Sequence, residues 1–119
     1  MKLLTAEIKK KIPALYAQEE LGTDAIVHVK FFNPQGQGTW YATEACAMVK
    51  DGEGWISKQL KHIRPEDQII DIRFFGLVDL QEKELGYFSF NELSEYRGRF
   101  GLGIERDMHF TRQPVKNFL

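Results

Sequence analysis

The stretch of sequence that decides the fold is residues 74–110, FFGLVDLQEKELGYFSFNELSEYRGRFGLGIERDMHF. Its first residues complete a run of apolar and aromatic side chains that predicts a long strand over residues 69–80. After a short polar connection, residues 85–90 predict the following strand, and Gly76 is expected to mark a bulge in the first one. Strands joined by so short a connection pair antiparallel.

A helix is expected directly after these strands. Ser89 is followed three residues later by Glu92, and this S-x-x-E spacing is the capping box that begins helices. Alternating side chains over residues 104–110 then predict a last strand. The segment between the helix and this strand contains three glycines that limit the helix to about Arg97: Gly98, Gly101 and Gly103.

The N-terminal part of the chain predicts a further helix. Thr5 is its expected N-cap, and Pro13 predicts a kink or a division into two short helices, because proline removes a backbone donor. The apolar stripe of this helix follows a four-residue spacing: Leu4, Ile8, Ile12 and Tyr16.

Residues 25–32 and 39–44 predict the two strands of a hairpin around an Asn-Pro-Gln-Gly turn. The next segment is less regular, and a short helix is expected near residues 56–63. Together these elements predict an α+β fold, with one domain over residues 1–119. Its sheet is expected to be mainly antiparallel with about five strands, flanked by an N-terminal helix and the helix after Ser89.

Composition narrows the classes of function. Lys and Arg number 16 and Asp and Glu number 17, so the net charge of −1 gives no overall electrostatic attraction to nucleic acid. The single cysteine, Cys46, fits a reducing cytoplasm, and no apolar run is long enough for a membrane span. No glycine-rich phosphate loop precedes a helix, and no cofactor is expected.

Several segments of the chain resemble the bacterial and phage family catalogued as domain of unknown function 2958. They are KLLTAEI, PALY, VKFF, TWYATE, FFGLV, ELGYFS, NEL and GLGIERDMHF. The resemblance covers residues 3–18, 27–44 and 74–110. It implies a small protein carried by plasmids, conjugative elements or phages, and it implies no activity. The chain departs from the family pattern at residues 45–73, which look like an insertion or elaboration, and at Gly103, where a proline is expected.

The last predicted strand offers a metal-site hypothesis. On a strand, Glu105, Asp107 and His109 point to one face, and two carboxylates with an imidazole can bind a divalent cation. The alternative interpretation is a solvated strand face, since alternation explains this spacing without any ligand.

Arg106 is expected on the opposite, apolar face of that strand. An inward arginine needs a partner for its guanidinium group, and Glu44 is the expected partner in a structural ion pair. The alternative is an arginine that binds a ligand. No second catalytic group has a defined spacing from Glu44, so no catalytic residue is assigned.

Two surfaces are candidates for binding macromolecules. One is an aromatic patch for a protein partner, at Trp40, Tyr41, Trp55 and Phe100. The other is a basic group for nucleic acid, at Lys9, Lys10, Lys11, Arg97 and Arg99, although the lysines also fit the exposed face of an amphipathic helix.

The leading hypothesis is a non-enzymatic, cytoplasmic accessory protein of a mobile genetic element that binds another protein and no membrane. The first alternative is a nucleic-acid-binding or antirestriction factor, which requires the lysines and arginines to converge on one face. The second is a metal-dependent enzyme that uses the acidic face at Glu105, Asp107 and His109.

Overall fold

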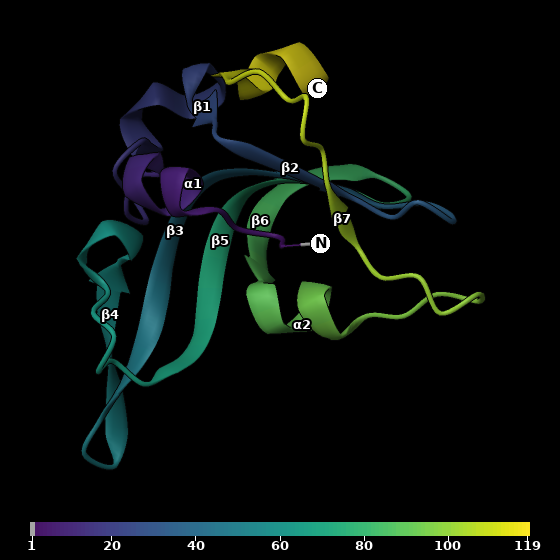
Figure 1. The fold of residues 1–119 in the computed structure, drawn as a ribbon. Coiled ribbons are helices and arrows are strands. Elements are labelled where there is room, and N and C mark those ends of the chain that lie inside the picture. The colour runs from purple at the N-terminus through teal and green to yellow at the C-terminus, as the bar shows by residue number, and fades with distance from the viewer. Residues whose placement is uncertain (1) are drawn as a thin grey trace.

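The computed structural model describes residues 2–119, and within them an antiparallel sheet with one long central strand organises the molecule (Figure 1). The strand order is β6-β5-β3-β2-β7, with β4 paired to β3. Their bounds are β2 Val29–Phe32, β3 Thr39–Asp51, β4 Gly54–Gln59, β5 Ile69–Asp79, β6 Lys83–Ser89 and β7 Glu105–Arg106. A separate two-stranded sheet joins β1 (Ile26–Val27) to β8 (Gln113–Pro114). The predicted α+β class with a mainly antiparallel sheet is confirmed.

The central strand, β3, has 13 residues and pairs with three neighbours. It contacts β5 along most of its length, β2 over its first residues and β4 over its last. The register with β5 shifts between Ala42 and Glu44, where Gly76 lies opposite Ala42. A Cβ atom on Gly76 would collide with the backbone carbonyl oxygen of Tyr41, so glycine is required there. The irregularity expected at Gly76 is present, with the extra residue on β3.

Both helix starts follow the predicted caps. The Thr5 Oγ1 atom accepts the backbone N–H of Ile8 at 3.1 Å, which begins α1 (Ala6–Lys11). Ser89 Oγ accepts the backbone N–H of Glu92 at 3.2 Å, which begins α2 (Phe90–Glu95). The α1 helix ends before Pro13, and a 3-10 helix, η1 (Glu19–Asp24), follows. No helix within residues 2–119 is long and apolar enough to cross a membrane.

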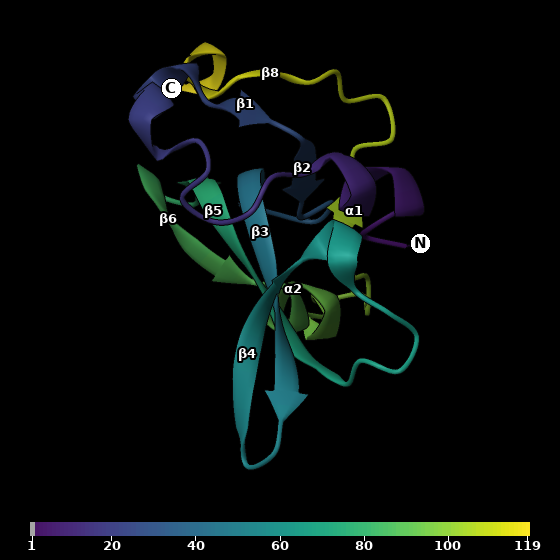
Figure 2. The same ribbon diagram turned by 90° about the vertical axis from the view of Figure 1, so that its left-hand side faces the viewer.

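Apolar side chains cover both faces of the sheet. On one face the ring of Phe74 lies 5.5 Å from that of Phe31 and 5.1 Å from that of Phe88, and α1 and α2 pack over this layer (Figures 1 and 2). On the other face, Tyr41 stacks on Phe118 with ring centroids 4.3 Å apart. Phe118 belongs to η3 (Val115–Phe118), so the C-terminal segment completes this second, smaller core.

Two predicted elements differ from the structure. Residues 54–59 form strand β4 in place of the expected short helix, because β3 extends far enough to pair with them from Cys46 to Asp51. The helical part there is limited to the 3-10 turn η2 (Leu60–His62).

The last strand, predicted over residues 104–110, is limited to β7. It ends because the Asp107 carboxylate accepts the backbone N–H of His109 at 2.9 Å, which turns the chain away from β2.

Candidate functional site

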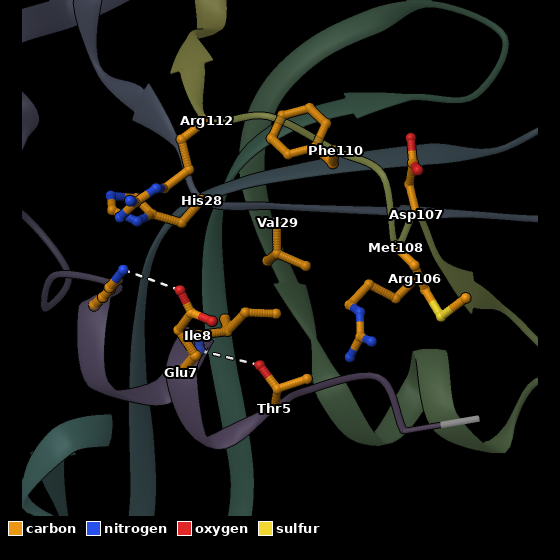
Figure 3. A pocket seen from close by; sticks show the side chains of 11 residues that line it. Thr5, Glu7, Ile8, His28, Val29, Arg106, Asp107, Met108, Phe110 and Arg112 are labelled. Atoms are coloured by element: carbon orange, nitrogen blue, oxygen red, sulfur yellow. Dashed lines mark hydrogen bonds and ion pairs between the residues drawn. The ribbon is translucent and has the colours of Figure 1, made fainter.

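A cavity of about 280 Å³ lies between α1 and the segment that leaves β7 (Figure 3). Ile8 of α1 and Val29 of β2 supply apolar side chains to it, and His28 lies between β1 and β2. The C-terminal segment closes it with Arg106, Phe110 and Arg112. The cavity therefore combines an apolar surface with cationic groups, and the term "pocket" below refers to it.

Backbone hydrogen bonds hold the walls of the pocket in place. The N–H of His28 donates to the carbonyl oxygen of Ala42 at 2.9 Å, which fixes His28 against β3. The N–H of Asp107 donates to the carbonyl oxygen of Lys30, also at 2.9 Å, which fixes the C-terminal segment against β2. These contacts join segments far apart in the sequence, so the pocket forms only when the sheet does.

The imidazole of His28 is the unusual group in the pocket. Its Nδ1 atom is buried and has no hydrogen-bond partner among the described residues. Burial and the nearby charge of Arg112 lower the pKa of His28 from 6.5 to about 4. At neutral pH the ring is therefore uncharged, and its buried nitrogen is an incompletely satisfied polar atom.

The acidic side chains of the pocket already have cationic partners. Glu7 lies 2.9 Å from Lys11, and this hydrogen bond lowers the pKa of Glu7. Asp107 lies 3.7 Å from Lys30. Arg106 donates to the backbone carbonyl oxygen of Lys2 at 2.8 Å, which joins the C-terminal segment to the start of the chain.

The structure does not assemble the predicted metal face. Because β7 ends at Arg106, strand alternation does not continue to Asp107 and His109. Asp107 is engaged by the backbone of His109 and by Lys30. Within residues 2–119, no group of three His, Cys, Asp or Glu side chains is placed to hold a metal ion.

Glu44 and Arg106, predicted as an ion pair, have different partners. The buried Glu44 carboxylate accepts the backbone N–H groups of Tyr16 at 2.8 Å and Gln18 at 2.6 Å. Tyr16 has a φ of 73°, a left-handed conformation that is uncommon for a tyrosine. Glu44 therefore anchors the loop after α1, a role that sequence reasoning missed because nothing local to Glu44 indicates the return of that loop.

The predicted aromatic patch does not form one surface. Tyr41 is buried under Phe118, and Trp40 packs against the main core opposite Phe31. Trp55 and Phe100 are exposed, with 49% and 78% of their surfaces accessible. They do not share one surface, because Trp55 lies on β4 and Phe100 lies in the loop after α2.

Ile56, the residue after Trp55, has apolar cross-strand neighbours that the sequence did not associate with it. Ile56 and Ile69 both lie opposite Val49, on the two strands that flank β3. Ile56, Ile69 and Ile70 are 43%, 40% and 45% exposed, whereas Val49 is 3% exposed. We use "hairpin end" for the group Val49, Ile56 and Ile69. Trp55 precedes Ile56 on β4 and pairs with Lys50, so its side chain points to the other face of the sheet.

The predicted basic residues lie in two places. Lys9, Lys10 and Lys11 belong to the last turn of α1, where Lys11 pairs with Glu7. Arg97 follows α2 and donates to the carbonyl oxygens of Ser94 and Tyr96 at 2.9 and 2.7 Å. In Figure 1, α1 lies at the left of the molecule and the segment after α2 extends to its right. The two groups of basic residues therefore do not converge on one surface.

Comparison with known proteins identifies a family for this chain. The model of a family described as "Protein of unknown function (DUF2958)" matches residues 48–119. The matched range takes in β4, β5 and the segment between them. No curated protein and no solved structure matches the chain.

Proposed function

The chain belongs to the DUF2958 family, and from that premise we propose that it is a non-enzymatic, cytoplasmic accessory protein of a mobile genetic element that binds another protein. The observation that supports this proposal is the hairpin end. Large apolar side chains gathered on a protein surface mark contact sites for other macromolecules. The partner is expected to present apolar side chains of its own.

The shape of the hairpin favours contact with a partner. Figures 1 and 2 show β3 and β4 extending together away from the rest of the molecule, with their turn at the far end. Ile56 and Ile69 flank Val49 on the face that forms the main core closer to the centre of the sheet. The apolar layer therefore continues past the helices that cover it elsewhere.

The hairpin is also braced against the rest of the chain. Lys58 Nζ donates to both carboxylate oxygens of Asp67, at 3.0 and 2.9 Å, and the backbone N–H of Arg64 donates to Asp67 at 2.7 Å. These bonds tie the loop between β4 and β5 to β4. A surface ordered before binding loses less conformational entropy when a partner docks.

Removing the apolar character of the hairpin end tests the proposal. Wild type and an Ile56→Asp/Ile69→Asp variant are compared as baits in an extract of the host that carries the mobile element. We expect the variant to lose the protein that wild type retains, while keeping the far-ultraviolet circular dichroism spectrum of the wild type. Equal retention by both baits would contradict the proposal.

A matched control tests whether the loss of binding depends on where the negative charges are placed, and not only on their addition. Leu21 and Leu80 are 51% and 48% exposed, comparable with the two isoleucines, and lie outside the hairpin end. A Leu21→Asp/Leu80→Asp variant carries the same added charge and is expected to retain the partner. Sedimentation of the isolated chain measures self-association. Self-association through the hairpin end would show that this surface binds a second copy of the chain and not another protein.

A further inference from the structure

We propose that the pocket between α1 and the C-terminal segment binds a carboxylate carried on a short apolar stem, with Arg112 as its main charged contact. The assignment is independent of the hairpin end. It rests on the charges around His28, on the apolar lining of the cavity and on the size of the cavity.

Among the described residues that line the pocket, the cations Lys11, Arg106 and Arg112 outnumber the carboxylates Glu7 and Asp107. Glu7 is a single carboxylate that faces two cations, Lys11 at 2.9 Å and Arg112, whose charge also lowers the pKa of Glu7. Glu7 cannot neutralise both. One monoanion would complete the balance, and the guanidinium group of arginine matches the planar geometry of a carboxylate.

The pocket presents apolar surface next to this charge. Ile8, Val29 and Phe110 line the same cavity as Arg112, and Figure 3 shows their side chains between Arg112 on one side and Arg106 on the other. An apolar stem attached to the anion would lie against these side chains. At about 280 Å³ the cavity is at the small end of ligand sites, which suits a short chain.

His28 provides a way to observe binding in the pocket. Burial and, to a smaller extent, the nearby charge of Arg112 lower the pKa of the imidazole, and Glu7 and Lys11 face the pocket from α1. A bound carboxylate would offset the charge of Arg112. Binding should therefore raise the pKa of His28, which a solvent-exposed or non-specific contact would leave unchanged.

Nuclear magnetic resonance titration of the whole chain with butyrate, acetate, butanol and inorganic phosphate tests the assignment. We expect butyrate to shift the signals of His28, Arg112 and Val29 to saturation, with a dissociation constant on the order of 10 mM. Acetate should bind about 16-fold more weakly, because it lacks two CH₂ groups and each buried CH₂ group is worth roughly fourfold in affinity. Butanol should cause no saturable shift.

Variants distinguish the pocket from general attraction to a basic surface. Arg112→Gln is expected to weaken butyrate binding about tenfold and to abolish the effect of butyrate on the His28 pKa. Arg99→Gln, at an exposed arginine in the loop after α2, is the matched control and should bind as wild type. The Ile56→Asp/Ile69→Asp variant should also bind butyrate normally, so the two proposals fail separately.

Three results would overturn the assignment. They are butyrate shifts that do not saturate, butyrate binding unchanged by Arg112→Gln, and phosphate binding more tightly than butyrate. Tighter binding of phosphate would indicate that the pocket binds a phosphate group and not a carboxylate.

Discussion

The carboxylate of Glu44 accepts the backbone N–H of Gln18 at 2.6 Å, across 26 residues of sequence. The same carboxylate accepts the N–H of Tyr16, and the side chain of Gln18 then bonds to the backbone of Ile26 and Thr43. One buried acid therefore fixes the path of the loop after α1 and, through Gln18, its attachment to β1 and β3.

Replacing Glu44 by alanine should destabilise the fold strongly. The substitution leaves two backbone donors without their acceptor, one buried at Gln18 and one partly buried at Tyr16. Hydrogen bonds to a charged group are worth about 1.5–3 kcal/mol each. We predict a loss of about 3 kcal/mol in the free energy of unfolding, measured by urea denaturation. Glu84→Ala, at an exposed position on β6, is the matched control and should change stability by less than about 0.5 kcal/mol. Equal losses of stability from the two substitutions would contradict the role of Glu44 in anchoring the loop after α1.

Gly76→Ala should also be costly, for a steric reason. The added methyl group would meet the carbonyl oxygen of Tyr41 on the paired strand, and backbone in the middle of a sheet has little room to move. We predict a loss of about 3 kcal/mol, in the upper range for overpacked sites. The directly paired glycine, Gly86, has no heavy atom within 4 Å of its added Cβ, so Gly86→Ala should be nearly neutral. A tolerated Gly76→Ala would show that the register shift can relax.

Several elements followed from local sequence, and others depended on distant pairing. The caps at Thr5 and Ser89 were predictable because each involves residues within three positions of one another. Strand β4 was not, because its pairing with the extension of β3 decides its conformation. The end of β7 was missed because alternation continues in the sequence after Asp107 has turned the chain.

The candidate sites were less predictable than the fold. Glu105, Asp107 and His109 formed a plausible pattern on a strand that the structure does not extend that far. The pocket joins His28 to Arg112, and no periodicity relates these positions. The hairpin end joins Ile56 to Ile69 through Val49, which requires knowledge of the strand register. Sites built across strands therefore depend on tertiary structure.

The stability of the protein should depend on pH through His28. The folded ring takes up a proton only near pH 4, whereas the unfolded ring does so near 6.5. Between these values the unfolded state binds more protons, so stability should fall as the pH falls from 6.5 to 4 and should show no His28 contribution above 6.5. Because the ring is only partly buried, we expect a loss of no more than about 2 kcal/mol from this residue.

Denaturation at a series of pH values checks this prediction. His28→Gln should remove the part of the slope between pH 6.5 and 4 that His28 causes, because the amide does not titrate. His62→Gln, at an exposed position in η2, is the histidine control and should keep the wild-type slope. A His28→Gln profile identical to that of the wild type would contradict the assignment of the slope to His28.

Site-specific photo-crosslinking at the hairpin end tests most directly whether this surface binds another protein. A photoreactive phenylalanine analogue replaces Ile56 in one variant and the comparably exposed Leu80 in another, and both are irradiated in the host cell. We predict one discrete cross-linked protein from position 56, none of it from position 80, and its disappearance when Ile69→Asp is added. Identical products from both positions, or no product from position 56, would contradict binding at the hairpin end.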